Sequence, residues 1–155
     1  MLYITLGIKP RKNLLDNWYF INPVNQNQIY DNVISTGKYI LDRYLLFYDY
    51  GAQPNYNLLN HYLDFNNEND TGNLFMEQSF QPGKFKIDTT YNFTFLCKSG
   101  LYSGNIMPST RDNDKRIYLN NDLLNVAIIK NEFYDSIIIG IKEGHREYLL
   151  AIKLE

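Results

Sequence analysis

The sequence has one cysteine, no long apolar run and no strong excess of charge of either sign. With a single cysteine, Cys97, no internal disulfide can form, and its place in the apolar run NFTFLCK predicts a thiol that packs as a small hydrophobe. The apolar stretch before Lys9 is too short for a signal peptide, and no later run approaches the roughly twenty apolar residues of a membrane-spanning helix. We therefore expect a cytoplasmic protein without a membrane partner.

The charge balance and the missing motifs argue against two classes of function. Fifteen Lys and Arg face seventeen Asp and Glu, whereas a protein that neutralises many phosphates is usually basic. The sequence also lacks a glycine-rich phosphate loop, a Gly-x-Ser-x-Gly nucleophile elbow and a His-Glu-x-x-His zinc motif. These absences favour a non-enzymatic protein, and we expect neither a cofactor nor a bound metal.

Large side chains suited to sheet faces dominate what is present. The chain is 45% hydrophobic and holds fourteen Tyr and nine Phe, a composition that favours strands over disorder. Runs of alternating apolar and polar residues recur along the chain, and no linker divides it. We therefore predict a mainly β fold over residues 1–155, a small single-domain barrel or sandwich with one or two short helices.

Three segments of this fold can be assigned more closely. Residues 28–51 fit two long strands about a turn at 36–38, and one helix over 35–48 is the alternative, because the apolar positions satisfy both periods. The run NDLLNVA, residues 121–127, has a capping residue before a Leu pair and predicts one or two helical turns. Residues 135–155 read as two strands of a closing hairpin with its turn at 143–146.

A group of tyrosines lies around the Gly/Pro break in DRYLLFYDYGAQPNYN. Tyrosine is favoured in binding surfaces because it combines a large contact area with a hydroxyl at modest entropic cost. The tyrosines that we predict to contact a partner are Tyr44, Tyr48, Tyr50 and Tyr56. The alternative is that the same side chains cover a barrel mouth or a sheet face.

Two groups of charged residues offer other functions. Arg111, Lys115 and Arg116 stand in the loop TRDNDKR before a predicted strand, where a phosphate-contacting face would need them. His61, three residues before Asp64, could act as a general base, and with Glu68 it would form the site of a small hydrolase. The acidic connector DFNNENDTG itself departs from a calcium loop at its sixth and twelfth positions, which favours a solvated hairpin tip.

The C-terminal third resembles the AbrB-type swapped-hairpin unit of transition-state regulators and antitoxin DNA-binding domains. Residues 116–119 (RIYL) match the family's second strand, and residues 122–124 (DLL) match the start of its short helix. Asp135 matches the Asp before the third strand, and residues 137–154 match the closing hairpin. The resemblance covers about residues 103–155 and implies an intertwined dimer or a pseudo-dimeric barrel, with Arg111, Lys115 and Arg116 near nucleic acid.

These observations lead to one main functional hypothesis and two alternatives. The main hypothesis is a non-enzymatic binding or assembly protein that acts through a surface for a protein partner or through self-association. Composition and the scarcity of motifs suggest an accessory or structural component of a phage or another mobile element. The alternatives are a nucleic-acid-binding regulator that uses the AbrB-like unit, and the small hydrolase.

Overall fold

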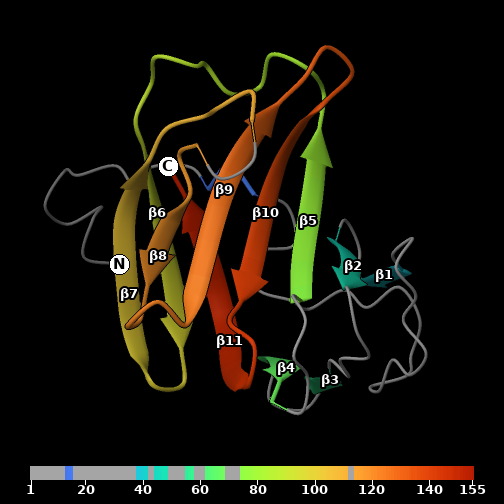
Figure 1. Cartoon of the computed structure of the whole chain (residues 1–155), viewed down its shortest axis with the longest axis vertical. Helices are drawn as coiled ribbons and strands as arrows, with labels where there is room; N and C mark the ends of the chain where they lie inside the picture. Colours follow the sequence, from blue (N-terminus) through green and yellow to red (C-terminus); the bar gives the residue numbers. More distant parts are fainter. Residues whose placement is uncertain are drawn as a thin grey trace, which may run out of the picture.

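The chain folds into two antiparallel β-sheets that pack face to face around one hydrophobic core, as a computed structural model shows (Figure 1). The structure describes residues 13–15, 38–41, 44–48, 55–57, 62–68, 74–111 and 114–155; for 38–41, 44–48 and 55–57 it describes the backbone alone. The predicted mainly β fold is confirmed, and of the two predicted architectures the chain adopts the sandwich.

Each sheet combines strands from both halves of the described chain. The six-stranded sheet has the spatial order β1 (Lys38–Leu41), β2 (Tyr44–Tyr48), β5 (Leu74–Phe80), β10 (Asp135–Ile141), β9 (Leu124–Lys130) and β8 (Ile117–Leu119). The five-stranded sheet has the order β3 (Asn55–Asn57), β4 (Tyr62–Asn67), β11 (His145–Leu154), β6 (Tyr91–Cys97) and β7 (Gly100–Ile106). In Figure 1 the strands β8, β9 and β10 lie in front of β6 and β11.

Alternation along the strands explains the core. In β6, Phe93, Phe95 and Cys97 are buried, while the residues between them face outward. In the opposite sheet, Leu74 and Met76 of β5 are buried in the same core. Because successive strand side chains point to opposite faces, each strand supplies one row to the core and a second row to the outer surface. The second row decides what each sheet presents to its surroundings.

The two sheets approach each other closely at the edge formed by β7 and β8. A Cβ atom at Gly104 would lie 3.1 Å from Ile117 Cδ1 and 3.1 Å from Leu119 Cδ2. The missing side chain on β7 therefore leaves room for the two inward side chains of β8. This contact joins the sheets at one edge of the sandwich.

The short helix predicted at 121–127 is wrong. Within the described ranges the structure contains strands and turns, and no helix there is long and apolar enough to cross a membrane. Asn120, Asn121 and Asp122 have φ angles of 56°, 53° and 67°, and the Leu123 amide donates to the Asn120 carbonyl at 3.0 Å. Asn and Asp adopt the left-handed region more readily than most residues, so they form a tight turn between β8 and β9 where a cap was expected.

The strand interpretation is confirmed over the described residues 38–41 and 44–48, whereas most of the predicted turn at 36–38 lies outside the described residues. Strands β1 and β2 pair antiparallel, with Lys38 opposite Leu46, so the segment predicted as one strand after that turn forms two paired strands. The closing hairpin is also wrong, because β10 pairs with β5 and β9, whereas β11 pairs with β4 and β6. The turn at 142–144 carries the chain from one sheet to the other, since both strands have an apolar row that must reach the same core.

Candidate functional site

A pocket lies beside Tyr148, on the outer face of the five-stranded sheet. Among the described residues, a cavity of about 330 Å³ is lined by Tyr62, Lys98, Tyr148 and Leu150, which we call the Tyr148 pocket. The rings of Tyr62 and Tyr148 meet edge to face, with centroids 5.4 Å apart and an interplanar angle of 78°. Lys98 Nζ lies 5.2 Å from the centroid of the Tyr148 ring. The pocket therefore combines apolar walls with one ammonium group.

Three strands bring these side chains together. Tyr148 on β11 pairs with Asp64 of β4, and the Lys98 amide at the end of β6 donates to the Tyr148 carbonyl at 3.0 Å. The register between β11 and β6 shifts between Leu149 and Ala151, so Leu150 is the extra residue of a β-bulge. The bulge keeps Tyr148 and Leu150 on the outer face while the residues after Ala151 return to the alternation that the core requires.

The positive charges beside the pocket differ in their partners. Arg146 Nε donates to Asp64 Oδ1 at 2.7 Å, a second nitrogen of the guanidinium donates to Oδ2, and Glu68 lies 3.7 Å away. The hydrogen bond to Asp64 raises the pKa of Arg146, so this guanidinium stays charged and paired. None of the described carboxylates forms an ion pair with Lys98. Lys98 is therefore the cation at this site that is open to an anionic partner.

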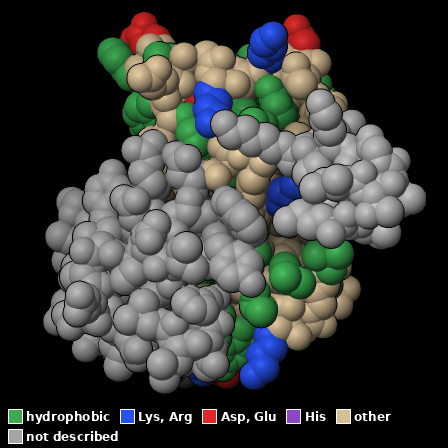
Figure 2. Space-filling view, turned by 180° about the vertical axis from the view of Figure 1, so that it is seen from behind, with side chains coloured by type: hydrophobic (Ala, Val, Ile, Leu, Met, Phe, Trp, Pro, Cys, Tyr) green, Lys and Arg blue, Asp and Glu red, His purple; other side chains and the backbone are tan. Residues whose placement is uncertain are grey.

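An exposed apolar pair extends the site toward the edge of the sheet. Leu96 on β6 and Leu101 on β7 are direct cross-strand neighbours, and their exposed fractions are 42% and 67%. Ala151, opposite Leu96 on β11, connects this pair with the bulge at Leu150. We call the Tyr148 pocket together with Leu96 and Leu101 the Tyr148 face. Figure 2, which views the molecule from behind, shows hydrophobic side chains and a cationic side chain near the lower end, with others near the upper end.

A buried network lies directly beneath the Tyr148 face. Glu147 is 5% exposed, and its carboxylate accepts hydrogen bonds from Ser99 Oγ and Asn120 Nδ2, each at 2.9 Å. Ser99 Oγ also lies 2.9 Å from the hydroxyl of Tyr102. These contacts tie the β6–β7 turn and the β8–β9 turn to β11. The carboxylate thus helps to fix the β6–β7 turn, which carries the pocket residue Lys98.

Cys97 lies in the same region and confirms the interpretation made from its sequence context. The thiol is 4% exposed, and burial together with the nearby Glu147 carboxylate raises the pKa of Cys97 to about 12. A thiol protonated at neutral pH is a poor nucleophile, and this one packs in the core as a small hydrophobe. Within the described ranges, no three His, Cys, Asp or Glu side chains come together as metal ligands.

The structure describes the tyrosines predicted from sequence only in part, by the backbone alone. Tyr44 and Tyr48 lie on β2 of the six-stranded sheet, Tyr56 lies on β3 of the five-stranded sheet, and Tyr50 is outside the described residues. Their role in partner binding stays a prediction. Sequence reasoning missed Tyr148, although its alternation with Glu147 and Leu149 on a strand could have placed it on an outer face.

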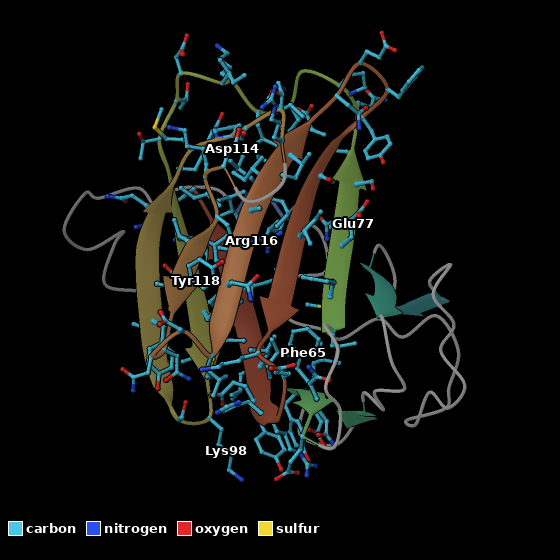
Figure 3. The ribbon with its side chains drawn as sticks, in the orientation of Figure 1. Phe65, Glu77, Lys98, Asp114, Arg116 and Tyr118 are labelled. Atoms are coloured by element: carbon cyan, nitrogen blue, oxygen red, sulfur yellow. The ribbon has the colours of Figure 1, made fainter. Side chains whose placement is uncertain are left out.

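The predicted nucleic-acid residues have different environments. Arg111 and Lys115 are exposed in the connection between β7 and β8. Arg116 instead donates a hydrogen bond from Nη1 to Asn125 Oδ1, and its Cζ lies 5.7 Å from the centroid of the Phe75 ring (Figure 3). The structure therefore commits Arg116 to contacts on the outer face of the six-stranded sheet.

The predicted hydrolase residues are only partly described. His61 lies outside the described residues, whereas Asp64 and Glu68 both face Arg146. The pairing of Asp64 through both of its oxygens gives that carboxylate a structural partner.

Two features that the AbrB-type resemblance implies differ in this chain, the short helix after β8 and the paired closing hairpin. The resemblance, the DNA-binding alternative and the mobile-element context all stay predictions. Comparisons of the chain with protein-family models, with curated protein sequences and with solved structures found no match.

Proposed function

We propose that the chain is a non-enzymatic binding protein whose protein partner contacts the Tyr148 face. The observation that carries this proposal is the pocket between Tyr62, Lys98, Tyr148 and Leu150, which opens beside the exposed Leu96–Leu101 pair. Two leucines exposed side by side stabilise a fold little, and exposed apolar patches next to a pocket are typical of contact surfaces.

The chemistry of this face fits a protein partner better than a reaction. Tyrosines are common anchors in protein interfaces, and a polar rim usually surrounds such anchors. Here the Arg146–Asp64 pair and Lys98 provide charged groups around the apolar centre. The buried carboxylates nearby are used in hydrogen bonds, Glu147 with Ser99 and Asn120 and Asp64 with Arg146, which supports binding rather than acid–base chemistry.

A photo-crosslinking experiment tests the proposal with a matched control. A benzophenone amino acid replaces Leu101 in one variant and Tyr118 in another, in cells that carry the natural gene. Both residues are exposed, 67% and 55%, on strands at corresponding edges of the two sheets, β7 and β8. We expect illumination to give a defined adduct from position 101 and none from position 118, with the partner identified by mass spectrometry.

The same experiment has a clear negative outcome. If position 101 gives no adduct, or only the adducts that position 118 also gives, the Tyr148 face is not the contact surface. The substitution Lys98→Glu provides a second check, because reversal of the charge at the rim should weaken the specific adduct by about tenfold or more.

A further inference from the structure

The turn between β9 and β10 presents an exposed aromatic side chain on a fixed backbone. Phe133 is 75% exposed and Tyr134 is 42% exposed. Asn131 Oδ1 accepts hydrogen bonds from the Phe133 amide at 2.8 Å and the Tyr134 amide at 2.9 Å, and the Asn131 amide donates to the Tyr134 carbonyl at 3.1 Å. An aromatic group held in this way loses little conformational entropy when a partner binds it.

The charge at this turn complements the charge of the Tyr148 pocket. Glu132 precedes Phe133 and is exposed, and none of the described cations forms an ion pair with it. The turn therefore offers an aromatic ring beside a carboxylate. The pocket offers apolar walls from Tyr62, Tyr148 and Leu150 beside the ammonium group of Lys98. Its volume of about 330 Å³ is enough for one aromatic side chain.

The turn and the pocket lie at opposite ends of the sandwich. Figure 1 places the β9–β10 turn at the top, and Figure 3 places Lys98 at the bottom. A chain of this shape cannot insert its own turn into its own pocket. We propose that the β9–β10 turn of one copy docks in the Tyr148 pocket of a second copy, with Phe133 in the cavity and Glu132 facing Lys98.

This inference rests on the proposed function, because it names a second copy of the chain as the partner of the Tyr148 face. The contact joins two different surfaces, so each copy keeps one free turn and one free pocket after the first contact. A heterologous contact of this kind grows into rings or open chains, whereas a two-fold contact would stop at a dimer. The protein therefore assembles head to tail.

Sedimentation of the full chain over a concentration series tests the proposal. From about 1 μM to about 1 mM, the range of weak protein contacts, the weight-average mass should rise from the single-chain value of 18.3 kDa to beyond that of two chains. Phe133→Ser and Lys98→Glu should each hold the mass at 18.3 kDa. Both changes are at exposed positions, so the melting temperatures should match the wild-type value.

Mixing the two variants gives the sharper result. Phe133→Ser chains keep an intact pocket and Lys98→Glu chains keep an intact turn, so an equal mixture should reach the mass of two chains and stay there. Tyr118→Ser and Lys115→Glu, matched changes at exposed positions of the opposite sheet and its loop, should associate like the wild-type chain.

Two outcomes overturn the inference. One is a wild-type mass that stays at 18.3 kDa throughout the series, and the other is a mixture of the two variants that does not associate. If the mass stays that of one chain while crosslinking from position 101 captures a different protein, the head-to-tail contact is wrong and the proposed function stands. If the chain neither associates nor gives a specific adduct from position 101, both the head-to-tail contact and the proposed function are wrong.

Discussion

A cation lies over an aromatic ring on the outer face of each sheet, but the two arrangements differ in what surrounds them. On the six-stranded sheet, Arg116 lies over Phe75 and hydrogen-bonds to Asn125. On the five-stranded sheet, Lys98 lies over Tyr148 at the edge of a cavity. The first cation is held by its neighbours, whereas the second borders open space.

Glycine explains why the first arrangement is closed. A Cβ atom at Gly140 would lie 2.6 Å from Asn125 Oδ1 and 3.0 Å from Phe75 Cδ1, so both side chains occupy the space above this glycine. We call Phe75, Arg116, Asn125 and Gly140 the Gly140 cluster. The same pair of residue types, a cation and an aromatic ring, is thus structural on one sheet and available for binding on the other. Their surroundings, rather than the pair itself, decide the role.

The largest effect should come from filling the space above Gly140. Gly140→Ala places a methyl group against Asn125 and Phe75, and overpacking of this kind costs about 1–3 kcal/mol of the free energy of unfolding. Urea denaturation measures the loss as a lower midpoint at an unchanged slope. Asn125→Ala should restore part of that space. The double variant should therefore lose less free energy of unfolding than the sum of the losses in the two single variants. Additive losses would contradict the close packing described for this cluster.

A smaller effect should separate the two cations. Arg116→Ala removes a hydrogen bond to Asn125 and a cation–π contact with Phe75, and we expect a loss of about 1–2 kcal/mol in the free energy of unfolding. Lys98→Ala removes an exposed side chain, and we expect a change within about 0.5 kcal/mol. Equal losses in the two variants would show that the two arrangements have the same structural role.

The smallest effect concerns Glu77, which lies on the outer face of the six-stranded sheet. Burial raises the pKa of Glu77, and the hydrogen bond from Ser79 opposes this effect only in part. The folded chain therefore holds the proton more tightly than the unfolded chain, so stability falls as the pH rises from the ordinary glutamate value through the raised one. Glu77→Gln removes this dependence.

Thermal melts at pH 4 and pH 7 measure the effect of Glu77. We expect Glu77→Gln to raise the melting temperature at pH 7 and to change it less at pH 4. Glu143→Gln, in the exposed turn between β10 and β11, is the control. A variant at Glu77 that melts lower than the wild-type chain at pH 7 would mean that the ionised carboxylate stabilises this face.

Local patterns in the sequence were enough to predict strands but not how the strands pair. Alternation identified β6 and β11 as strands, because burial on one face repeats every second residue. The Asn-Asn-Asp run at 120–122 was misread as a helix cap, since the same residue types also form left-handed turns. In sequence, residues 142–144 look like the turn of a hairpin. Only the packing of β10 and β11 in different sheets around one core shows that this turn connects the two sheets.

The candidate site could not be predicted from local sequence patterns either, because it also depends on how the strands pair. Tyr62 and Tyr148 come from strands far apart in the chain and meet because β4 pairs with β11. Arg116 was predicted to lie near nucleic acid, and the residues that it contacts, Phe75 and Asn125, belong to two strands, β5 and β9. A single sequence indicates which side chains face outward, whereas their neighbours across strands depend on topology.

The most direct test of the account is a residue-resolved measurement on the unmodified chain. Amide chemical shifts recorded by NMR at low and high protein concentration report which surface takes part in contacts. The account predicts shifts at Tyr62, Lys98, Tyr148 and Leu150 and at the turn 131–134, with the Gly140 cluster unchanged. Shifts concentrated at Arg116, Asn125 and Gly140, with the Tyr148 pocket unchanged, would contradict it.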